Sequence, residues 1–176
     1  GNGHPGNPTM SRRDGSVLLL ALGNDIIGDD GVALEAARAL RKRFDESSEV
    51  EVLESGESGL CLIDIMSPYE RVLLLDSIES GDMSLGTIRE FTQDDFHKVL
   101  GPSPHYAGLP EVIALAEKLG IDFPQELRVL AIKIAPQEEF RQGLSNEIQQ
   151  VLPKYVDEAE LILLEWTQPS ARSIID

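Results

Sequence analysis

The stretch Leu22-Gly23-Asn24-Asp25-Ile26-Ile27-Gly28-Asp29-Asp30-Gly31 decides how this chain folds. It follows an aliphatic run at residues 17–22 and precedes an amphipathic segment at residues 32–44. This order predicts a buried strand, a loop bounded by glycines and the start of a helix. In many nucleotide-binding folds such a loop presents backbone N–H groups to a phosphate. Here the loop ends in Asp29 and Asp30, whose charges disfavour a phosphate and favour a cation.

The remainder of the chain continues this alternation of strands and helices. Strands are expected at residues 17–22, 49–54, 72–75, 86–91 and 127–134. Helices are expected at residues 32–44 and 60–66, after Pro110 and after Ser145. Successive β-helix-β units give a parallel, right-handed sheet with helices on both faces. The sequence therefore predicts an α/β fold, a three-layer α/β/α sandwich around a twisted, mostly parallel five-stranded sheet. At the expected site its strand order is flavodoxin-like, starting 2-1-3.

The last helical pattern contains a proline. Ser145 can cap this helix, and Pro153 lies within the pattern, where it is expected to kink the helix or to split it in two. Apolar residues then continue through residues 161–166.

One domain is expected, over residues 16–166. Residues 1–15 are interpreted as a disordered arm or an expression remnant, and residues 167–176 as a flexible tail. No apolar run approaches the ~20 residues that cross a bilayer. The N-terminal residues also lack the apolar core of a secretory signal. We therefore expect a protein that is not inserted in a membrane.

The composition is strongly acidic, with a formal net charge of −16. This charge argues against nucleic acids and anionic membranes as partners, because both bind basic surfaces. Cys61 is the only cysteine, so neither an intrachain disulfide nor a cysteine-only metal site can form. It lies in an apolar segment and is expected to pack there. A reducing cytoplasm fits this cysteine usage, and we expect a cytoplasmic monomer.

Carboxylates follow two strands whose ends are expected to meet. Asp29 and Asp30 follow the first strand, and Asp76 follows the third. In an open α/β sheet, ligands bind outside the carboxyl ends of the strands, where the strand order reverses. Two carboxylates in one crevice need a proton or a metal between them. His105, in a loop stiffened by two prolines, is the third candidate, and this set leaves open positions on a zinc or nickel ion.

Each of these residues also has an ordinary structural interpretation. Asp29 or Asp30 can simply be a helix N-cap, and Asp25 is interpreted as a turn residue. Asp76 can merely end its strand, and a single loop histidine such as His105 is more often without a catalytic role. The residues alone leave these alternatives open.

Four motifs together resemble those of the hydrogenase maturation proteases. They are, in order, Gly23-Asn24-Asp25-Ile26-Ile27-Gly28-Asp29-Asp30-Gly31, residues 72–78 with Asp76, Ser103-Pro104-His105 followed by Gly108-Leu109, and Pro136 followed by Gly143-Leu144-Ser145. The similarity covers residues 17–166 without a large insertion. Each motif alone is weak, but their order and spacing make the resemblance specific.

The resemblance implies a phosphorylase/hydrolase-like α/β/α fold and an endopeptidase. Such an enzyme removes the C-terminal extension of a nickel–iron hydrogenase large-subunit precursor after nickel insertion. The family's metal ligands fall on Asp30, Asp76 and His105, which are also the implied catalytic residues. The nickel would come with the precursor rather than as a resident cofactor, and zinc or cadmium could occupy the site in vitro. Asp29 would act as outer support or as a base.

The resemblance also places substrate selection in the loop after the second strand. In this chain the loop reads Glu54-Ser55-Gly56-Glu57-Ser58-Gly59, and Glu54, Gly56 and Gly59 are the expected substrate-binding residues. Relatives usually have Asp followed by Gly at the first two positions, so the precursor recognised is left open. Two alternatives also remain at this stage. One is a nickel- or precursor-binding chaperone that does not cleave, and the other is a different metal-dependent peptidase on the same fold.

Overall fold

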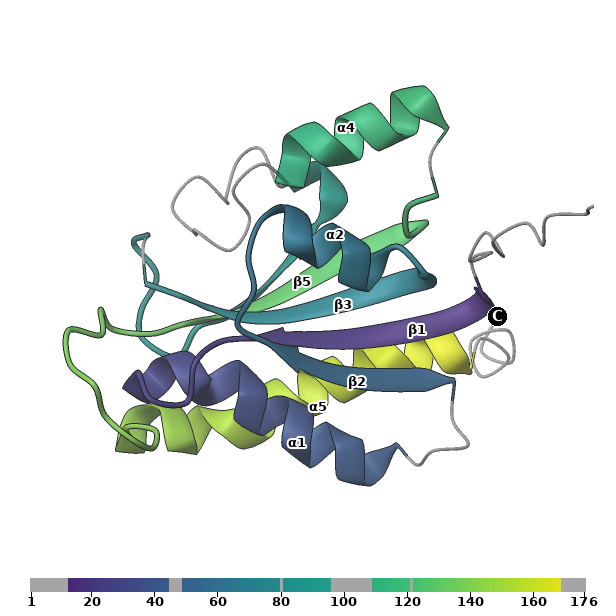
Figure 1. The fold of residues 1–176 in the computed structure, drawn as a ribbon. Coiled ribbons are helices and arrows are strands. Elements are labelled where there is room, and N and C mark those ends of the chain that lie inside the picture. The colour runs from purple at the N-terminus through teal and green to yellow at the C-terminus, as the bar shows by residue number, and fades with distance from the viewer. Residues whose placement is uncertain (1–12, 45–48, 80, 96–108, 121, 169–176) are drawn as a thin grey trace, which may run out of the picture.

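The computed structural model describes residues 13–44, 49–79, 81–95, 109–120 and 122–168 (Figure 1). The strands are β1 (Arg13–Leu22), β2 (Val50–Ser55), β3 (Tyr69–Ile78), β4 (Ile88–Thr92) and β5 (Glu126–Lys133). The helices are α1 (Val32–Arg43), α2 (Leu60–Met66), α4 (Leu109–Leu119) and α5 (Asn146–Thr167), with 3-10 turns η1 (Gly28–Gly31) and η2 (Gln93–Asp95).

All five strands form one sheet, in the order β2-β1-β3-β5-β4. β1 pairs in parallel with β2 and β3, and β3 pairs in parallel with β5. β4 alone is antiparallel, at the edge beside β5. The mostly parallel five-stranded sheet and its 2-1-3 start are therefore confirmed. From β1 the chain adds β2 on one side of the sheet, and from β3 it adds the later strands on the other side. The strand order therefore reverses between β1 and β3.

Helices cover both faces of the sheet, with α1 and α5 on one face and α2 and α4 on the other (Figure 1). Side chains alternate along each strand, so Leu19 and Leu73 face α1 and α5, whereas Leu18 and Leu74 face α2 and α4. All four are fully buried, and burying each contributes roughly 1.5–3 kcal/mol. This two-sided burial explains the continuous aliphatic runs, and it confirms the three-layer sandwich.

α5 is one continuous helix, so of the two effects expected of Pro153, a kink or a split, the split is wrong. Ser145 caps it as expected, accepting the backbone N–H of Ile148 at 3.4 Å. Pro153 has no backbone N–H to donate to the carbonyl of Gln149, four residues earlier. Both residues are exposed, so this carbonyl can bond water instead. Buried side chains lie both before and after the proline, so packing on the sheet holds the two halves in one helix.

The short helix α2 buries only Leu62 and Met66, which lie four residues apart on one face. The expected packing of Cys61 is wrong, because the thiol lies on the other face and is exposed. The first strand begins at Arg13, ahead of the expected domain start at residue 16. No helix within the described ranges is both long and apolar enough to span a bilayer.

Candidate functional site

The carboxyl ends of β1 and β3 carry two of the three predicted metal ligands. Asp76 and Ser77 are at the end of β3, where Asp76 has no exposed surface and Ser77 retains only 8%. Asp30 is half-buried and lies in η1, the turn that follows β1. Since β1 and β3 are neighbouring parallel strands, the fold brings Asp30 and Asp76 to the same edge of the sheet.

Ser77 is hydrogen-bonded to both acids. Its hydroxyl donates to Asp30 Oδ1 at 2.9 Å, and its backbone N–H donates to Asp76 Oδ1 at 2.9 Å. In the part of the chain described, Asp30 Oδ2 accepts no hydrogen bond. A carboxylate that is anchored through one oxygen and open at the other has the arrangement of a one-oxygen metal ligand. Carboxylate oxygens such as those of Asp30 and Asp76 are donors that a divalent cation binds.

Gly23 allows the loop to fold back onto the end of β1. A Cβ at this position would lie only 2.2 Å from the carbonyl oxygen of Asp30. The turn is closed by the Asp30 N–H, which donates to the carbonyl of Ile27 at 3.1 Å. A glycine is needed here because the backbone of the predicted ligand passes where a side chain would be.

His105, the third predicted ligand, lies outside the described residues, as do His97 and His4. Within the described ranges, no three His, Cys, Asp or Glu side chains form a group that could hold a metal. The roles of Asp30, Asp76 and His105 as ligands stay predictions.

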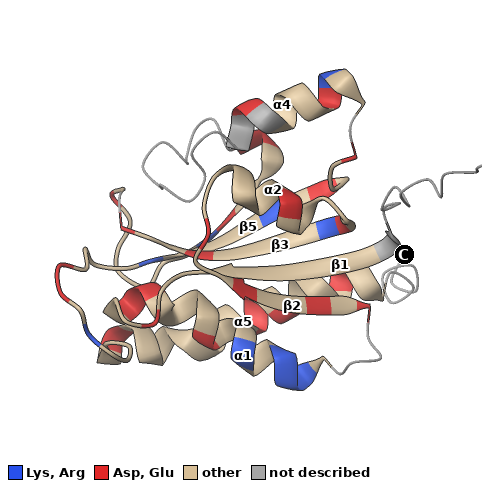
Figure 2. Ribbon diagram, in the orientation of Figure 1, with Lys and Arg blue, Asp and Glu red and all other residues tan. Residues whose placement is uncertain are grey.

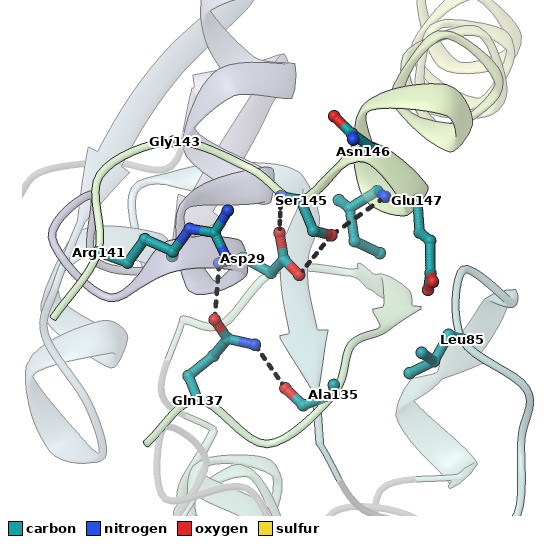
Figure 3. Close-up of a pocket in the computed structure, with 11 residues that line it drawn as sticks. Asp29, Leu85, Ala135, Gln137, Arg141, Gly143, Ser145, Asn146 and Glu147 are labelled. Atoms are coloured by element: carbon teal, nitrogen blue, oxygen red, sulfur yellow. Dashed lines mark hydrogen bonds between the residues drawn. The ribbon is translucent and has the colours of Figure 1, made fainter. Parts of the chain in front are cut away.

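Asp29 is buried and fastens the loop to the start of α5 (Figure 3). Its Oδ1 accepts the backbone N–H of Ser145 at 2.7 Å, and its Oδ2 accepts the Ser145 hydroxyl at 2.8 Å. No side chain caps η1 or α1, so the interpretation of Asp29 or Asp30 as the N-cap of the following helix is wrong. Both oxygens of Asp29 are engaged, which favours a supporting role over that of a base.

The loop between β5 and α5 packs directly on the loop after β1. Ile27 forms a parallel bridge with Arg141, and the N–H of Gly28 donates to the Arg141 carbonyl at 2.7 Å. Gln137 accepts the N–H of Asp29 at 3.1 Å. Gly28 has a φ of +51°, and a Cβ there would lie 2.3 Å from Gln137 Oε1. The left-handed backbone and this close approach both require glycine.

A pocket of about 500 Å³ opens between these two loops and the first turn of α5 (Figure 3). Its lining includes Asp29, Leu85, Gln137, Arg141 and Glu147. Sequence reasoning singled out neither Gln137 nor Arg141, and of this region it noted only Pro136 and the Gly143-Leu144-Ser145 run. Their contacts with the loop after β1 are made across more than 100 residues, so no local pattern reveals them.

Glu54, at the end of β2, is paired within the protein. Its carboxylate contacts Arg38 at 2.7 Å and Arg41 at 3.2 Å, both on α1. Arg38 also pairs with Asp25 at 2.7 Å, and Asp25 lies in a turn, as expected. The hydrogen bonds to Asp25 and then to Glu54 raise the pKa of the Arg38 guanidinium. Gly56 is exposed in the loop that follows, and substrate contact by this loop stays a prediction.

Tyr155 of α5 reaches the sheet close to Asp76. The phenol is fully buried and donates to the carbonyl of Leu130 at 2.6 Å. Burial raises the pKa of the Tyr155 hydroxyl well above its usual value, and the negative charge of Asp76 raises it further. The hydroxyl therefore stays neutral across the physiological range.

Acidic side chains dominate the loops at the carboxyl ends of the strands (Figure 2). Three of the four basic residues of α1, Arg41, Lys42 and Arg43, lie in its last turn, away from those loops (Figure 2). The fourth, Arg38, is paired with Asp25 and Glu54. The site edge is therefore an environment that favours cations.

Comparisons with known proteins agree on one family. A family model for hydrogenase maturation proteases matches residues 34–162. The hydrogenase expression/formation protein HupD of Rhizobium leguminosarum bv. viciae is 27% identical over 153 residues, which are 85% of this chain and 75% of that protein. The hydrogenase 2 maturation protease of Escherichia coli is 25% identical over 118 residues, 66% of this chain and 71% of that one.

Solved structures show the same fold. The hydrogenase maturating endopeptidase HybD of E. coli superposes with a TM-score of 0.74 at 23% identity, covering 85% of this chain and 93% of that one. HybD of Thermococcus kodakarensis gives a TM-score of 0.64 at 29% identity, with 84% and 98% covered. The α/β/α sandwich is thus the fold of the maturation endopeptidases. The chain belongs to the hydrogenase maturation protease family, as the sequence motifs predicted, and it is an endopeptidase of hydrogenase maturation.

Proposed function

We propose that this endopeptidase removes the C-terminal extension of a nickel–iron hydrogenase large-subunit precursor, and that nickel already held by the precursor marks it for cleavage. Family membership supports the reaction and the kind of partner. The observation that carries the nickel-dependent part is the hydrogen-bonded group of Asp30, Ser77 and Asp76 where the strand order reverses. A pair of acids placed in this way is ready for a cation that arrives with the substrate.

In this proposal Asp30, Asp76 and His105 complete the coordination of the precursor's nickel. Carboxylate and imidazole ligands suit a divalent first-row ion. Asp30 would bind through Oδ2, the oxygen that Ser77 does not occupy. Nickel bound in this way could polarise the scissile carbonyl or activate a water, both recognised roles of a metal ion in hydrolysis.

The loop after β2 would contact the precursor and contribute to its selection. Gly56 is exposed, and Gly59 has a φ of +60°. These features leave an open backbone for a polypeptide to approach. Glu54 would act through Arg38, because its carboxylate is already engaged there. We place the reaction in the cytoplasm and expect a monomer.

Mass spectrometry of a candidate precursor, incubated with this protein, tests the proposal. Nickel-loaded and nickel-free precursors are compared, with Asp76→Ala as the inactive control. Shortening of the loaded precursor only, at its C-terminus, supports the proposal. Binding without shortening indicates a non-cleaving chaperone, and equal shortening of both forms indicates a peptidase with its own tightly held metal.

A further inference from the structure

Ser77 makes the only hydrogen bond that the Asp30 carboxylate has within the described residues. We propose that Ser77 is a positioning residue, whose hydroxyl holds Asp30 Oδ1 so that Oδ2 is presented to the nickel-bearing substrate. This inference rests on the proposed function, since it takes Asp30 as a ligand. Ser77 itself does not touch the metal in this scheme.

Ser77 is well suited to hold another residue because its own position is fixed. It lies in β3 and pairs in register with Ile132 of β5. It is almost fully buried, so a change of its side-chain rotamer would lose contacts on several sides. Asp30, in contrast, sits in a short 3-10 turn and is half-exposed. The rigid partner therefore restrains the more exposed one.

The same residue also holds the second predicted ligand. The backbone N–H of Ser77 donates to Asp76 Oδ1, so one residue links the orientation of both acids. Ligating carboxylates commonly have such partners behind them, and removing one typically weakens metal affinity or activity by about 10–100-fold. The N–H persists in any substitution other than proline. Ser77→Ala therefore removes the hydrogen bond to Asp30 and keeps the hydrogen bond to Asp76.

The chain offers a matched control for the loss of a serine hydroxyl. The Ser145 hydroxyl also donates to an aspartate carboxylate, that of Asp29, at 2.8 Å. Asp29 is not among the predicted ligands. Ser145→Ala thus removes an equivalent hydrogen bond from the neighbouring residue of the same loop, without releasing Asp30.

Calorimetric titration of the full-length protein with Cd²⁺ alone tests the inference without relying on cleavage. Ser77→Ala should bind Cd²⁺ roughly tenfold more weakly than the wild type. Ser77→Thr keeps the hydroxyl and should restore most of the affinity. Ser145→Ala should leave it unchanged. In an Asp30→Ala background, Ser77→Ala should cause no additional loss, because Ser77 acts through Asp30.

Cleavage of the nickel-loaded precursor gives a second measurement. Ser77→Ala should lower kcat and leave KM near the wild-type value. The inference would be overturned if Ser77→Ala bound Cd²⁺ as tightly as the wild type or more tightly. It would also be overturned if Ser77→Ala reduced the Cd²⁺ affinity as much in the Asp30→Ala background as in the wild type. Failure of the wild type to bind Cd²⁺ would instead contradict the ligand set of the proposed function, and the inference would fall with it. Thermal melting of each variant checks its fold. If Ser77→Ala does not fold, Ser77→Cys takes its place, because a thiol is only a weak hydrogen-bond donor and should also weaken Cd²⁺ binding.

Discussion

Asp76 is an acidic side chain with no exposed surface, and its negative charge acts on Tyr155 of α5. Burying a carboxylate is costly unless hydrogen bonds or a cation compensate for the lost hydration. Ser77 supplies one such bond. A cation arriving with the substrate would supply the larger compensation, which is a physical reason for a protein to maintain an acid at this position.

The first prediction concerns the three proposed ligands. Asp30→Ala, Asp76→Ala and His105→Ala should each abolish processing of a nickel-loaded precursor, because each removes one ligand of the shared metal. Far-ultraviolet circular dichroism should show an intact fold. If any one variant cleaves at the normal rate, its residue does not belong to the site.

The buried charge also has a consequence for stability. Asp76→Asn removes the charge and keeps an oxygen that can accept the Ser77 N–H. We expect processing to be lost and the melting temperature to rise by a few degrees, because a functional acid is replaced by a neutral group. Thermal unfolding monitored by circular dichroism measures the shift. A lower melting temperature would show that Asp76 stabilises the free protein, contrary to this electrostatic account.

The raised pKa of Tyr155 predicts that the protein loses stability at alkaline pH. Its pKa is raised in the folded state, so its contribution is complete below the unfolded pKa of about 10 and is lost as the pH rises above that value. The free energy of unfolding should fall by up to about 1.4 kcal/mol per pH unit there. Urea titrations between pH 8 and 11 measure this slope. It should be shallower in Tyr155→Phe than in Tyr69→Phe, a half-buried control, and equal slopes would contradict the assignment.

At the scale of elements, two loops and the start of α5 form one hydrogen-bonded unit. The loop after β1 is joined to the loop after β5 through the Ile27–Arg141 bridge. It is joined to α5 through Asp29 and Ser145. Asp30 directly follows Asp29, and the loop that carries it is held by backbone N–H groups that a Ser145→Ala substitution leaves in place.

Removing this connection should act on stability more than on chemistry. Asp29→Ala leaves the Ser145 N–H without its partner, at an expected cost of roughly 1–3 kcal/mol. A double-mutant cycle with Ser145→Ala, measured by urea unfolding, should show coupling between the two residues. Residual processing should exceed that of Asp30→Ala. A variant that is fully stable yet inactive would assign Asp29 to catalysis instead.

The elements that the sequence predicted correctly are those that local patterns control. The aliphatic run before Gly23 and the amphipathic segment after Gly31 determine β1 and α1, and they place Asp30 at a strand end. The errors arose where distant packing decides. Pro153 does not split α5, because buried side chains hold the helix on both sides of the proline. Cys61 is exposed because α2 buries only one narrow face.

The site was predictable in part, because local patterns also place its two acids at strand ends. Asp30 and Asp76 come to one edge because Asp30 follows β1 and Asp76 lies near the carboxyl end of β3, and these two strands are neighbours in the sheet. The partners of Asp29 could not be predicted, since Ser145 is 116 residues away. Ser77 was missed although it follows Asp76 directly, because the direction of its hydroxyl depends on how η1 folds back. A polar residue at the end of an apolar strand was the only available signal.

At the scale of the whole molecule, the fold is shared with a protein of very different sequence. Identity to HybD of E. coli is only 23%, yet the TM-score is 0.74. The formal net charge of −16 and the acidic loops at the site edge (Figure 2) together favour a substrate that brings positive charge to this edge. Nickel within the precursor meets that requirement.

In the function proposed above, nickel in the precursor is what this endopeptidase recognises. The most direct test measures the initial rate of cleavage against the fraction of precursor molecules that contain nickel, using mixtures of nickel-loaded and nickel-free precursor at constant total concentration. We expect a rate that starts at zero and rises in proportion to that fraction. Cleavage of nickel-free precursor at the same rate as the loaded form would contradict recognition through nickel.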